Sequence, residues 1–294
     1  MDEQERLAER FEEHRPRLRA VAYRMLGSLA EADDAVQDAW LRLSRADVSD
    51  VENLGGWLNT VVARLALNMI RSRRARREEP WSPYVPEPVV DRPDRSEPEH
   101  EALLADSVGL ALLVVLQMLT PAERLAFVLH DMFAVPFEEI APIVERSPQA
   151  ARQLASRARR RVRATAPVPD ADLTSQRQVI DAFIAAARDG DFDGLVAVLD
   201  PDVLLRADRG AVPVGAATEI RGARAVARQA QSYSRLDLVQ RPVLVNGAAG
   251  VVAIRHGQPF AVMGVTVRER KIVEIDILAD PERLARLDLT VLDR

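Results

Sequence analysis

The sequence predicts a multidomain protein in which two all-α domains, a helical bundle and a helix-turn-helix domain, precede an α+β domain. Its 294 residues are about twice the usual length of a single domain. A stretch rich in proline and carboxylates interrupts the helical part, and the residues beyond Pro167 have the pattern of two helices followed by strands. The predicted parts are residues 1–78, a linker at 79–100, residues 101–166, and residues 172–294 with a C-terminal tail.

The first domain contains a helix that begins at Ser28. Gly27 suits a helix stop, and Ser28 and Glu31 have the spacing of a capping box. Small and apolar residues recur on one side of this helix, so the other side is expected to face outward. The expected outward residues are Asp33, Asp34, Gln37, Asp38 and Leu41.

The next helix is expected from about Leu54 to Arg77. Its expected buried residues are Leu58, Val61, Val62, Leu65 and Met69. Its opposite side carries Thr60, Arg64, Asn68 and Arg71. The following text, "EPWSPYVPEPVVDRPDRSEPE", has no helical period and is expected to be an extended linker.

The second helical domain ends in a strongly basic helix. The text "LTPAERLAFVLHDMFAVPFEEIAPIVERSPQAARQLASRARRRVR" predicts three short helices, the first capped by Thr120 with Pro121 at its first position. The last is rich in arginine and free of acids, although the chain has a net charge of -5. Its expected buried stripe is Ala151, Leu154, Ala155, Ala158 and Val162.

The basic helix and the short helix before it predict a helix-turn-helix. Polar residues near the start of such a helix can hydrogen-bond base edges, and arginines along its flanks can neutralise phosphates. The outward face carries Ser147, Gln149, Arg152, Gln153, Ser156 and Arg157. A solvated basic helix at a domain edge is the alternative interpretation.

The residues beyond Pro167 predict two helices and then a series of strands. Asn246-Gly247 and His256-Gly257 are expected to be the turns between strands. The chain has no cysteine, and its four histidines lie far apart in sequence, so we expect no metal site and no cofactor. The longest apolar run is too short to cross a bilayer and the N-terminus lacks a secretory signal, so we expect a cytoplasmic protein without a membrane partner.

Two blocks of sequence resemble the extracytoplasmic-function (ECF) RNA polymerase sigma factors. "FEEHRPRLRAVAYRMLGSLAEADDAVQDAWLRLSR" and "NLGGWLNTVVARLALNMIRSRRARRE" resemble region 2, and the block from "LTPAERL" to "RRRVR" resembles region 4. The blocks cover over half of the chain in the family's order. The resemblance implies an alternative sigma factor that binds core RNA polymerase through the β′ coiled coil and the β flap, recognises -10 and -35 promoter DNA, and has no catalytic residue.

The resemblance also implies roles for the outward faces. The acidic face from Asp33 to Leu41 would bind the β′ coiled coil. The loop from Ser44 to Asn53 and the next helix would hold the single-stranded -10 element. The -10 candidates are Trp57, Asn59, Thr60, Arg64, Asn68 and Arg71. Trp57 could stack on a base or belong to the core, and Trp40 is assigned to the core.

The outward face of the basic helix would read the -35 element. Its more C-terminal arginines are expected to balance phosphates or nearby carboxylates rather than to read sequence. These residues are Arg159, Arg160, Arg161 and Arg163.

The last domain resembles the SnoaL-like branch of the NTF2-like fold, an α+β cone with an apolar interior. ECF sigma factors with this fusion, the SigJ-like type, carry signatures that have counterparts here: a tryptophan and Pro-Glu-Pro in the linker, "DLTSQR" at Asp172, and an Asn-Gly turn. The resemblance implies an intrinsic regulator that packs on the sigma regions, with an unknown small ligand in the cone as a further partner. The expected regulatory contacts are Trp81, Pro86, Glu87, Pro88, Asn246, Gly247 and Gly250.

Two other functions remain open. Related cone folds include isomerases and cyclases, for which the available acid or base groups are Asp200, Asp202, Tyr233 and His256. A one-component helix-turn-helix regulator would bind a two-fold DNA site without polymerase. The acidic helix and the -10 helix argue against that regulator.

Overall fold

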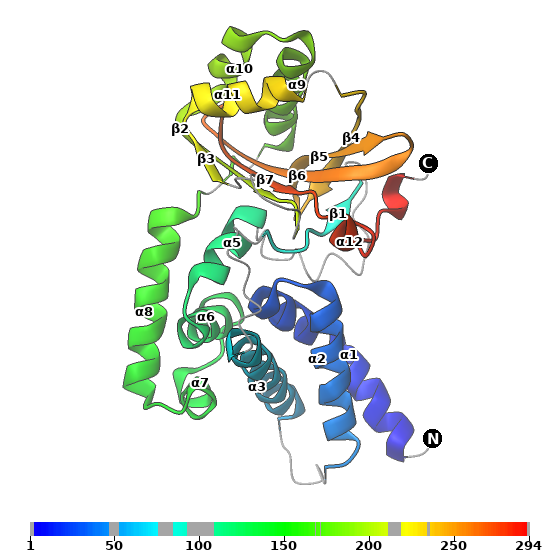
Figure 1. The fold of residues 1–294 in the computed structure, drawn as a ribbon. Helices are drawn as coiled ribbons and strands as arrows, with labels where there is room; N and C mark the ends of the chain where they lie inside the picture. The colour runs from blue at the N-terminus through cyan, green and yellow to red at the C-terminus, as the bar shows by residue number, and fades with distance from the viewer. Residues whose placement is uncertain are drawn as a thin grey trace. The chain divides into compact units, whose positions relative to one another are not determined.

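A computed structural model describes residues 3–46, 53–75, 85–92, 109–167, 169–170, 172–210, 219–233 and 236–292. The chain divides into two compact units, whose elements are labelled in Figure 1. The helical unit comprises Met1–Glu79, Glu101–Asp106 and Val115–Thr165. The mixed unit comprises Pro80–His100, Ser107–Val114 and Ala166–Arg294. The predicted linker therefore belongs to the mixed unit, and both predicted helical domains contribute to the helical unit.

The first part of the helical unit consists of α1 (Glu3–Leu26), α2 (Leu29–Leu43) and α3 (Leu54–Ala75). Helix α1 stops at Gly27, which has a φ of 71° that favours glycine. Ser28 then caps α2, because its hydroxyl accepts a hydrogen bond from the Glu31 amide at 3.3 Å. Asn53 caps α3 in the same way, through the Gly56 amide at 2.9 Å. Local capping chemistry thus sets the start of both helices.

The second part consists of the C-terminal end of α5 (Leu110–Met118), α6 (Pro121–Phe127), the π-helix η1 (Val128–Met132), α7 (Phe137–Val144) and α8 (Pro148–Thr165). Thr120 and Glu123 form a full capping box at the start of α6. Helix α7 ends at Glu145 in the left-handed conformation, with a φ of 55°, which turns the chain into α8. The α7–α8 pair is the expected helix-turn-helix.

The mixed unit is a curved sheet with helices on one face (Figure 1). The helices are α9 (Leu173–Asp189), α10 (Phe192–Val198) and α11 (Ala223–Ser232), and short helices α12 (Pro281–Leu284) and η2 (Thr290–Leu292) end the chain. The strands are β1 (Val90–Asp91), β2 (Leu199–Asp208), β3 (Glu219–Arg221), β4 (Val239–Val245), β5 (Ala248–Arg255), β6 (Gln258–Arg268) and β7 (Lys271–Leu278).

Among the described residues, the sheet order is β1-β4-β5-β6-β7-β2-β3; the β2–β7 pair is parallel and the other pairs are antiparallel. Both predicted hairpin turns are present: Asn246 and Gly247 have φ values of 50° and 77°, and His256 and Gly257 have 51° and 76°. Two consecutive positive φ values are the geometry of the tight turns that Asn-Gly favours. This confirms the α+β architecture expected for the C-terminal part.

Part of the predicted extended linker is a strand of this sheet. Val90 pairs with Val245 and Asp91 pairs with Leu244, so β1 lies antiparallel to β4 at the sheet edge. Every residue from Val85 to Asp91 is buried. An unpaired sheet edge offers free backbone donors and acceptors, which an extended proline-rich segment without a helical period can satisfy. This pairing ties the linker to the mixed unit.

Candidate nucleic-acid interface

Helix α8 presents the predicted reading face to solvent. Ala151, Ala155 and Ala158 are buried, whereas Leu154 and Val162 are half-buried at the margins of the stripe. All of the predicted -35 readers are exposed: Ser147, Gln149, Arg152, Gln153, Ser156 and Arg157. Ser147 also caps the helix by accepting from the Ala150 amide at 3.2 Å. In Figure 1, α8 lies at the opposite flank of the helical unit from α1 and α2.

Arg152 is held in place on the reading face by the short helix before it. Its Nη2 lies 2.8 Å from Glu138 Oε1, and its guanidinium carbon lies 5.5 Å from the Phe137 ring centroid. Both partners are on α7, so the helix-turn-helix orients this side chain. The pair is half exposed, so the guanidinium can exchange its partner at small cost.

The arginines further along α8 fall into two groups. Arg159 pairs with Asp131, and Arg161 Nη1 lies 2.9 Å from Glu123 Oε2. Arg157 Nε lies 3.7 Å from Glu123 Oε1, which leaves Glu123 between two cations although its side chain is only 5% exposed. Within the described residues, Arg160 and Arg163 are exposed and form no ion pair. The two unpaired arginines are the better candidates for phosphate contacts.

Helix α3 presents most, but not all, of the predicted -10 residues together. Arg64, Asn68 and Arg71 are exposed on one stripe, and Trp57 and Thr60 are half-buried at the N-terminal end of the same stripe. The Thr60 hydroxyl donates to the Gly56 carbonyl at 3.1 Å. The predicted loop from Ser44 to Asn53 lies largely outside the described residues, which stop at 46 and resume at 53.

Asn59 does not lie on this stripe. At 100° per residue it points about 140° away from Arg64. Its Oδ1 atom is buried and makes no hydrogen bond within the described residues. The structure therefore places the amide oxygen of Asn59 apart from the stripe that carries the other -10 candidates. Of the predicted buried residues of α3, Leu58, Val62 and Leu65 are buried and Val61 and Met69 are half-buried.

The acidic face of α2 is exposed throughout, at Asp33, Asp34, Gln37, Asp38 and Leu41. Asp33 pairs with Arg19 of α1 at 2.6 Å, whereas Asp34 and Asp38 form no ion pair within the described residues. Leu41 is 41% exposed, which is unusual for a large apolar residue in this chain. Trp40 packs 5.2 Å from the buried Phe11 ring and is half-buried, so it lies at the edge of the core.

Direct contacts join the two parts of the helical unit. Arg124 of α6 donates to the main-chain oxygen of Met25 at 2.6 Å, and both residues are buried. Arg17 donates to the Phe133 carbonyl at 2.7 Å, and the Arg24 guanidinium lies 5.0 Å from the Phe133 ring centroid. Helix α3 also packs on α6 and α7. The expected -10 and -35 helices thus belong to one closed unit.

In the mixed unit, the linker is fixed by three residues that we call the linker clasp: Val85, Asp208 and Arg283. Asp208 Oδ2 accepts from the Val85 amide at 3.3 Å and from Arg283 Nη1 at 2.5 Å. Arg283 Nη2 donates to the Val85 carbonyl at 2.6 Å. The clasp joins the linker, β2 and the C-terminal tail, and sequence reasoning did not single out any of its residues as a regulatory contact.

Of the predicted regulatory contacts, Trp81 lies outside the described residues, and Asn246 holds the linker at Val89. Asn246 donates from its amide to the Val89 carbonyl at 2.8 Å and accepts from the Val89 amide at 3.2 Å. A side chain at Gly250 would meet Val245 Cγ2 at 2.4 Å, so only glycine fits there. Pro86, Glu87 and Pro88 are all buried, and Gly247 has the positive φ of the turn.

The residues considered for an enzyme are not brought together. Tyr233 lines a cavity under α9 and α11. Asp200 accepts from the Asp202 amide at 2.9 Å in a tight turn, and His256 is exposed at the β5–β6 turn. In the parts of the chain that the structure describes, no group of histidine and acidic residues could hold a metal ion, and no helix is long and apolar enough to cross a membrane.

Comparisons with known proteins extend over both units. The family model of Sigma-70 region 2 matches residues 10–76, and that of Sigma-70 region 4 matches residues 109–162. The ECF RNA polymerase sigma factor SigJ of Mycobacterium tuberculosis (strain ATCC 25618 / H37Rv) is 38% identical over 291 residues, covering 93% of this chain and 91% of the relative.

A second relative and a solved structure are similar over nearly the whole chain as well. The probable ECF RNA polymerase sigma factor SigI of Mycobacterium tuberculosis (strain CDC 1551 / Oshkosh) is 36% identical over 273 residues, covering 92% of each chain. The crystal structure of Mycobacterium tuberculosis SigJ has a TM-score of 0.75 at 34% identity, and covers 96% of this chain and 99% of that one. The similarity therefore includes the mixed unit and is not confined to the helices.

Proposed function

The chain belongs to the extracytoplasmic-function family of RNA polymerase sigma factors and is an alternative sigma factor with a fused NTF2-like domain. From this assignment we propose which partner each exposed surface of the helical unit binds. Helix α8 reads the -35 element, α3 holds the -10 strand, and α2 binds the β′ coiled coil of core polymerase. The observation that carries this proposal is the polar face of α8, on which every predicted -35 reader is exposed.

Helix α8 combines base readers and phosphate partners at suitable positions. Arg152, Gln149 and Gln153 lie in its first turns, where a recognition helix meets base edges. Arg160 and Arg163 lie further along, exposed and without carboxylate partners among the described residues. The first group supplies sequence preference and the second supplies salt-dependent affinity.

Helices α2 and α3 suit different partners because their charges differ. Asp34, Asp38 and Leu41 give α2 an exposed acidic face with one apolar contact, which complements a basic coiled coil. Arg64, Asn68 and Arg71 give α3 a polar and cationic stripe suited to a single strand. Asn59 is left out of this stripe because its amide oxygen is buried.

Promoter binding requires the closed helical unit to open. The -35 and -10 elements lie about 25 base pairs apart, or about 85 Å along B-DNA. A compact unit of roughly 140 residues is about 35–40 Å across. One closed unit therefore cannot contact both elements, and the contacts of Arg124 and Arg17 must break when polymerase and promoter bind.

The mixed unit regulates this opening through the linker. Residues 79–100 span about 75 Å when fully extended, which is enough to let the two helical parts separate. Residues 85–91 are bound to the mixed unit through β1 and the linker clasp. While they are bound, the part of the linker that can extend between the two helical parts is shorter. The clasped state favours the closed helical unit, and release of the clasp favours the open one.

The mixed unit has no catalytic role in this proposal. Acid–base chemistry needs a titratable group that faces the bound substrate. Of the groups considered, only Tyr233 lines the apolar cavity, and no aspartate or glutamate of the described residues lines it.

The test is in vitro transcription with core polymerase on a genomic library of promoters, using the full chain and a chain truncated near Pro167. We expect start sites that share -35 and -10 elements and that depend on the added chain. A chain with Arg152→Gln serves as the matched variant, because it should redistribute start sites by their -35 sequence. If neither the full nor the truncated chain directs specific initiation, the proposal is wrong.

A further inference from the structure

The mixed unit encloses a large apolar cavity between its sheet and its helices. Its volume is about 610 Å³, within the range of small-molecule sites. Phe183 and Ile184 of α9, Leu205 of β2, and Met263 and Ile275 of the central strands contribute apolar walls. A cavity of this size and composition accommodates the hydrophobic body of a small molecule.

One end of the cavity carries a cation and a hydroxyl. Arg209 donates from Nη2 to the Tyr233 hydroxyl oxygen, and its guanidinium carbon lies 5.7 Å from the Tyr233 ring centroid. The tyrosine oxygen accepts this bond, so its own hydrogen remains able to donate. Arg209 and Tyr233 both line the cavity and together offer several donors to one anionic oxygen.

Arg209, which is half-buried, differs in its partner from Arg206 and Arg283 of the mixed unit. Arg206 pairs with Glu274 and Asp276, and Arg283 pairs with Asp208. Arg209 has no carboxylate partner among the described residues, and no described acidic side chain lines the cavity. This end of an otherwise apolar cavity therefore carries a positive charge that no described carboxylate balances.

The cavity lining includes close sequence neighbours of two clasp residues, Asp208 and Arg283. Leu205, Ala207 and Arg209 of the β2 segment face the cavity, and Asp208 between them points to the opposite face and holds Val85. Ala279 and Pro281 line the cavity as well, and Pro281 begins the short helix that carries Arg283. Occupants of the cavity thus contact both sequence neighbours of Asp208 and a residue two positions before Arg283.

We propose that this cavity binds a hydrophobic small molecule with one anionic group, which pairs with Arg209 and Tyr233, and that its binding is coupled to the linker clasp. The coupling rests on the proposed regulation of the helical unit, whereas the binding itself does not. Reciprocal linkage requires that a change in the clasp alter the affinity for the occupant.

The probes are 8-anilinonaphthalene-1-sulfonate and N-phenyl-1-naphthylamine, which share a ring system and differ by the sulfonate. Fluorescence titration of the full chain should give saturable 1:1 binding, with the sulfonate bound about tenfold more tightly, as expected for a charge-assisted pair. Arg209→Gln should abolish this preference and leave the affinity for the neutral probe within about twofold. Ala230→Phe, which fills the cavity from α11, should weaken both probes.

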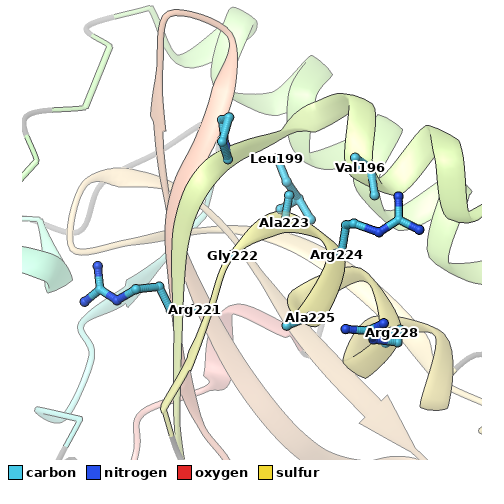
Figure 2. A pocket seen from close by; sticks show the side chains of 9 residues that line it. Val196, Leu199, Arg221, Gly222, Ala223, Arg224, Ala225 and Arg228 are labelled. Carbon is cyan, nitrogen blue, oxygen red and sulfur yellow. The ribbon is translucent and has the colours of Figure 1, made fainter.

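The matched control is Arg228→Gln. Figure 2 shows Arg224 and Arg228 of α11 on the opposite side of the view from Arg221, and all three line a second pocket that shares no residue with the cavity. This substitution removes the same charge from the same unit and should leave both affinities unchanged. Equal loss in Arg228→Gln and Arg209→Gln, or a sulfonate preference that survives Arg209→Gln, would overturn the site.

The coupling is tested in the same titration with Arg283→Ala, which opens the clasp and lies outside the cavity lining. We expect the affinity for the sulfonate probe to change by roughly threefold or more. An unchanged affinity would show that binding in the cavity is not coupled to the clasp. Because no transcription is measured, failure here leaves the sigma-factor assignment intact, and failure of specific initiation leaves the binding site intact.

Discussion

Arg124 of α6 donates a 2.6 Å hydrogen bond to the main-chain oxygen of Met25 at the end of α1, and both residues are buried. The same guanidinium bonds the Gln117 side chain and carbonyl at 2.8 Å each. One side chain therefore links the two halves of the helical unit. This bond has to break if the -10 and -35 helices are to reach their separate elements.

Arg124→Ala is expected to loosen the helical unit. Loss of a buried, charge-assisted contact should cost about 1.5–3 kcal/mol of unfolding free energy and raise the open fraction. Denaturant unfolding measures the cost, and small-angle scattering measures the increase in radius. The control is Arg15→Ala, whose exposed pair with Glu12 should contribute less than about 1 kcal/mol. Equal radii for wild type and Arg124→Ala would speak against a closed resting state held by this contact.

Arg152→Gln and Arg160→Gln should affect promoter DNA differently. Arg152 lies on the reading face, so its loss should change which -35 sequences bind, at about 1–3 kcal/mol for the affected base pair. Arg160 is exposed and unpaired among the described residues, so its loss should weaken all sequences and lower the salt slope by about 1. Binding to a randomised -35 duplex at several salt concentrations separates the two effects. Identical sequence profiles for wild type and Arg152→Gln would exclude a reading role.

Arg161→Ala should act mainly on stability. Arg161 pairs with the buried carboxylate of Glu123, which also forms the capping box of α6. Removal of one cation leaves this carboxylate less well compensated, whereas DNA affinity should fall less than in Arg160→Gln. Thermal unfolding and duplex binding of the two variants provide the comparison. If Arg161→Ala lost more DNA affinity than Arg160→Gln, Arg161 would be a phosphate contact and not mainly a stabilising partner of Glu123.

Asp276 should titrate well above the usual pH range of an aspartate. Burial raises the pKa of its carboxyl to about 6, against the opposing effect of Arg206. In the unfolded chain the proton leaves near pH 4, so the folded state holds it more tightly and loses stability as pH rises from about 4 to 6. Asp276→Asn removes this loss, so its stability relative to wild type should increase across that window. Carbon-detected titration of the side chain, and exchange protection of β7 amides, measure both effects; a pKa near 4 would refute the expectation.

Arg283→Ala should release the linker and raise transcription. The substitution removes bonds to Asp208 and to the Val85 carbonyl, so the clasped state should weaken by about tenfold or more. Arg286→Ala is the control, since the Arg286 side chain is exposed on the same tail, and the contact of Arg286 with the clasp, from its backbone amide to the Arg283 carbonyl at 3.1 Å, survives the substitution. Promoter-specific transcripts per unit of chain should rise for the first and not for the second. No difference between them would remove the clasp from regulation.

Local chemistry made much of the fold predictable from the sequence. Ser28, Thr120 and Asp172 start helices through side-chain caps that depend on two or three neighbouring residues. The exposed face of α8 follows from the helical period alone, because small residues recur every three or four positions. The hairpin turns at Asn246 and His256 follow from the glycine after each.

Contacts between distant segments could not be predicted. The pairing of Val90 with Val245 makes a strand from part of the linker. This strand has two residues, which is too short for an alternating pattern to be recognised in the sequence. The partners of Arg159 and Arg161 on η1 and α6 are likewise visible only after folding. Asn59 was one of the -10 candidates from the sequence, and the fold places its amide oxygen inside.

The central claim, that the helical unit opens on the promoter, is tested most directly by a distance measurement. The chain has no cysteine, so Glu13→Cys on α1 and Ala164→Cys on α8 provide two exposed labelling sites. We expect high energy transfer between dyes at these sites in the free chain, and low transfer in the complex with core polymerase and promoter DNA. High transfer that persists in a complex competent for specific initiation would contradict the claim.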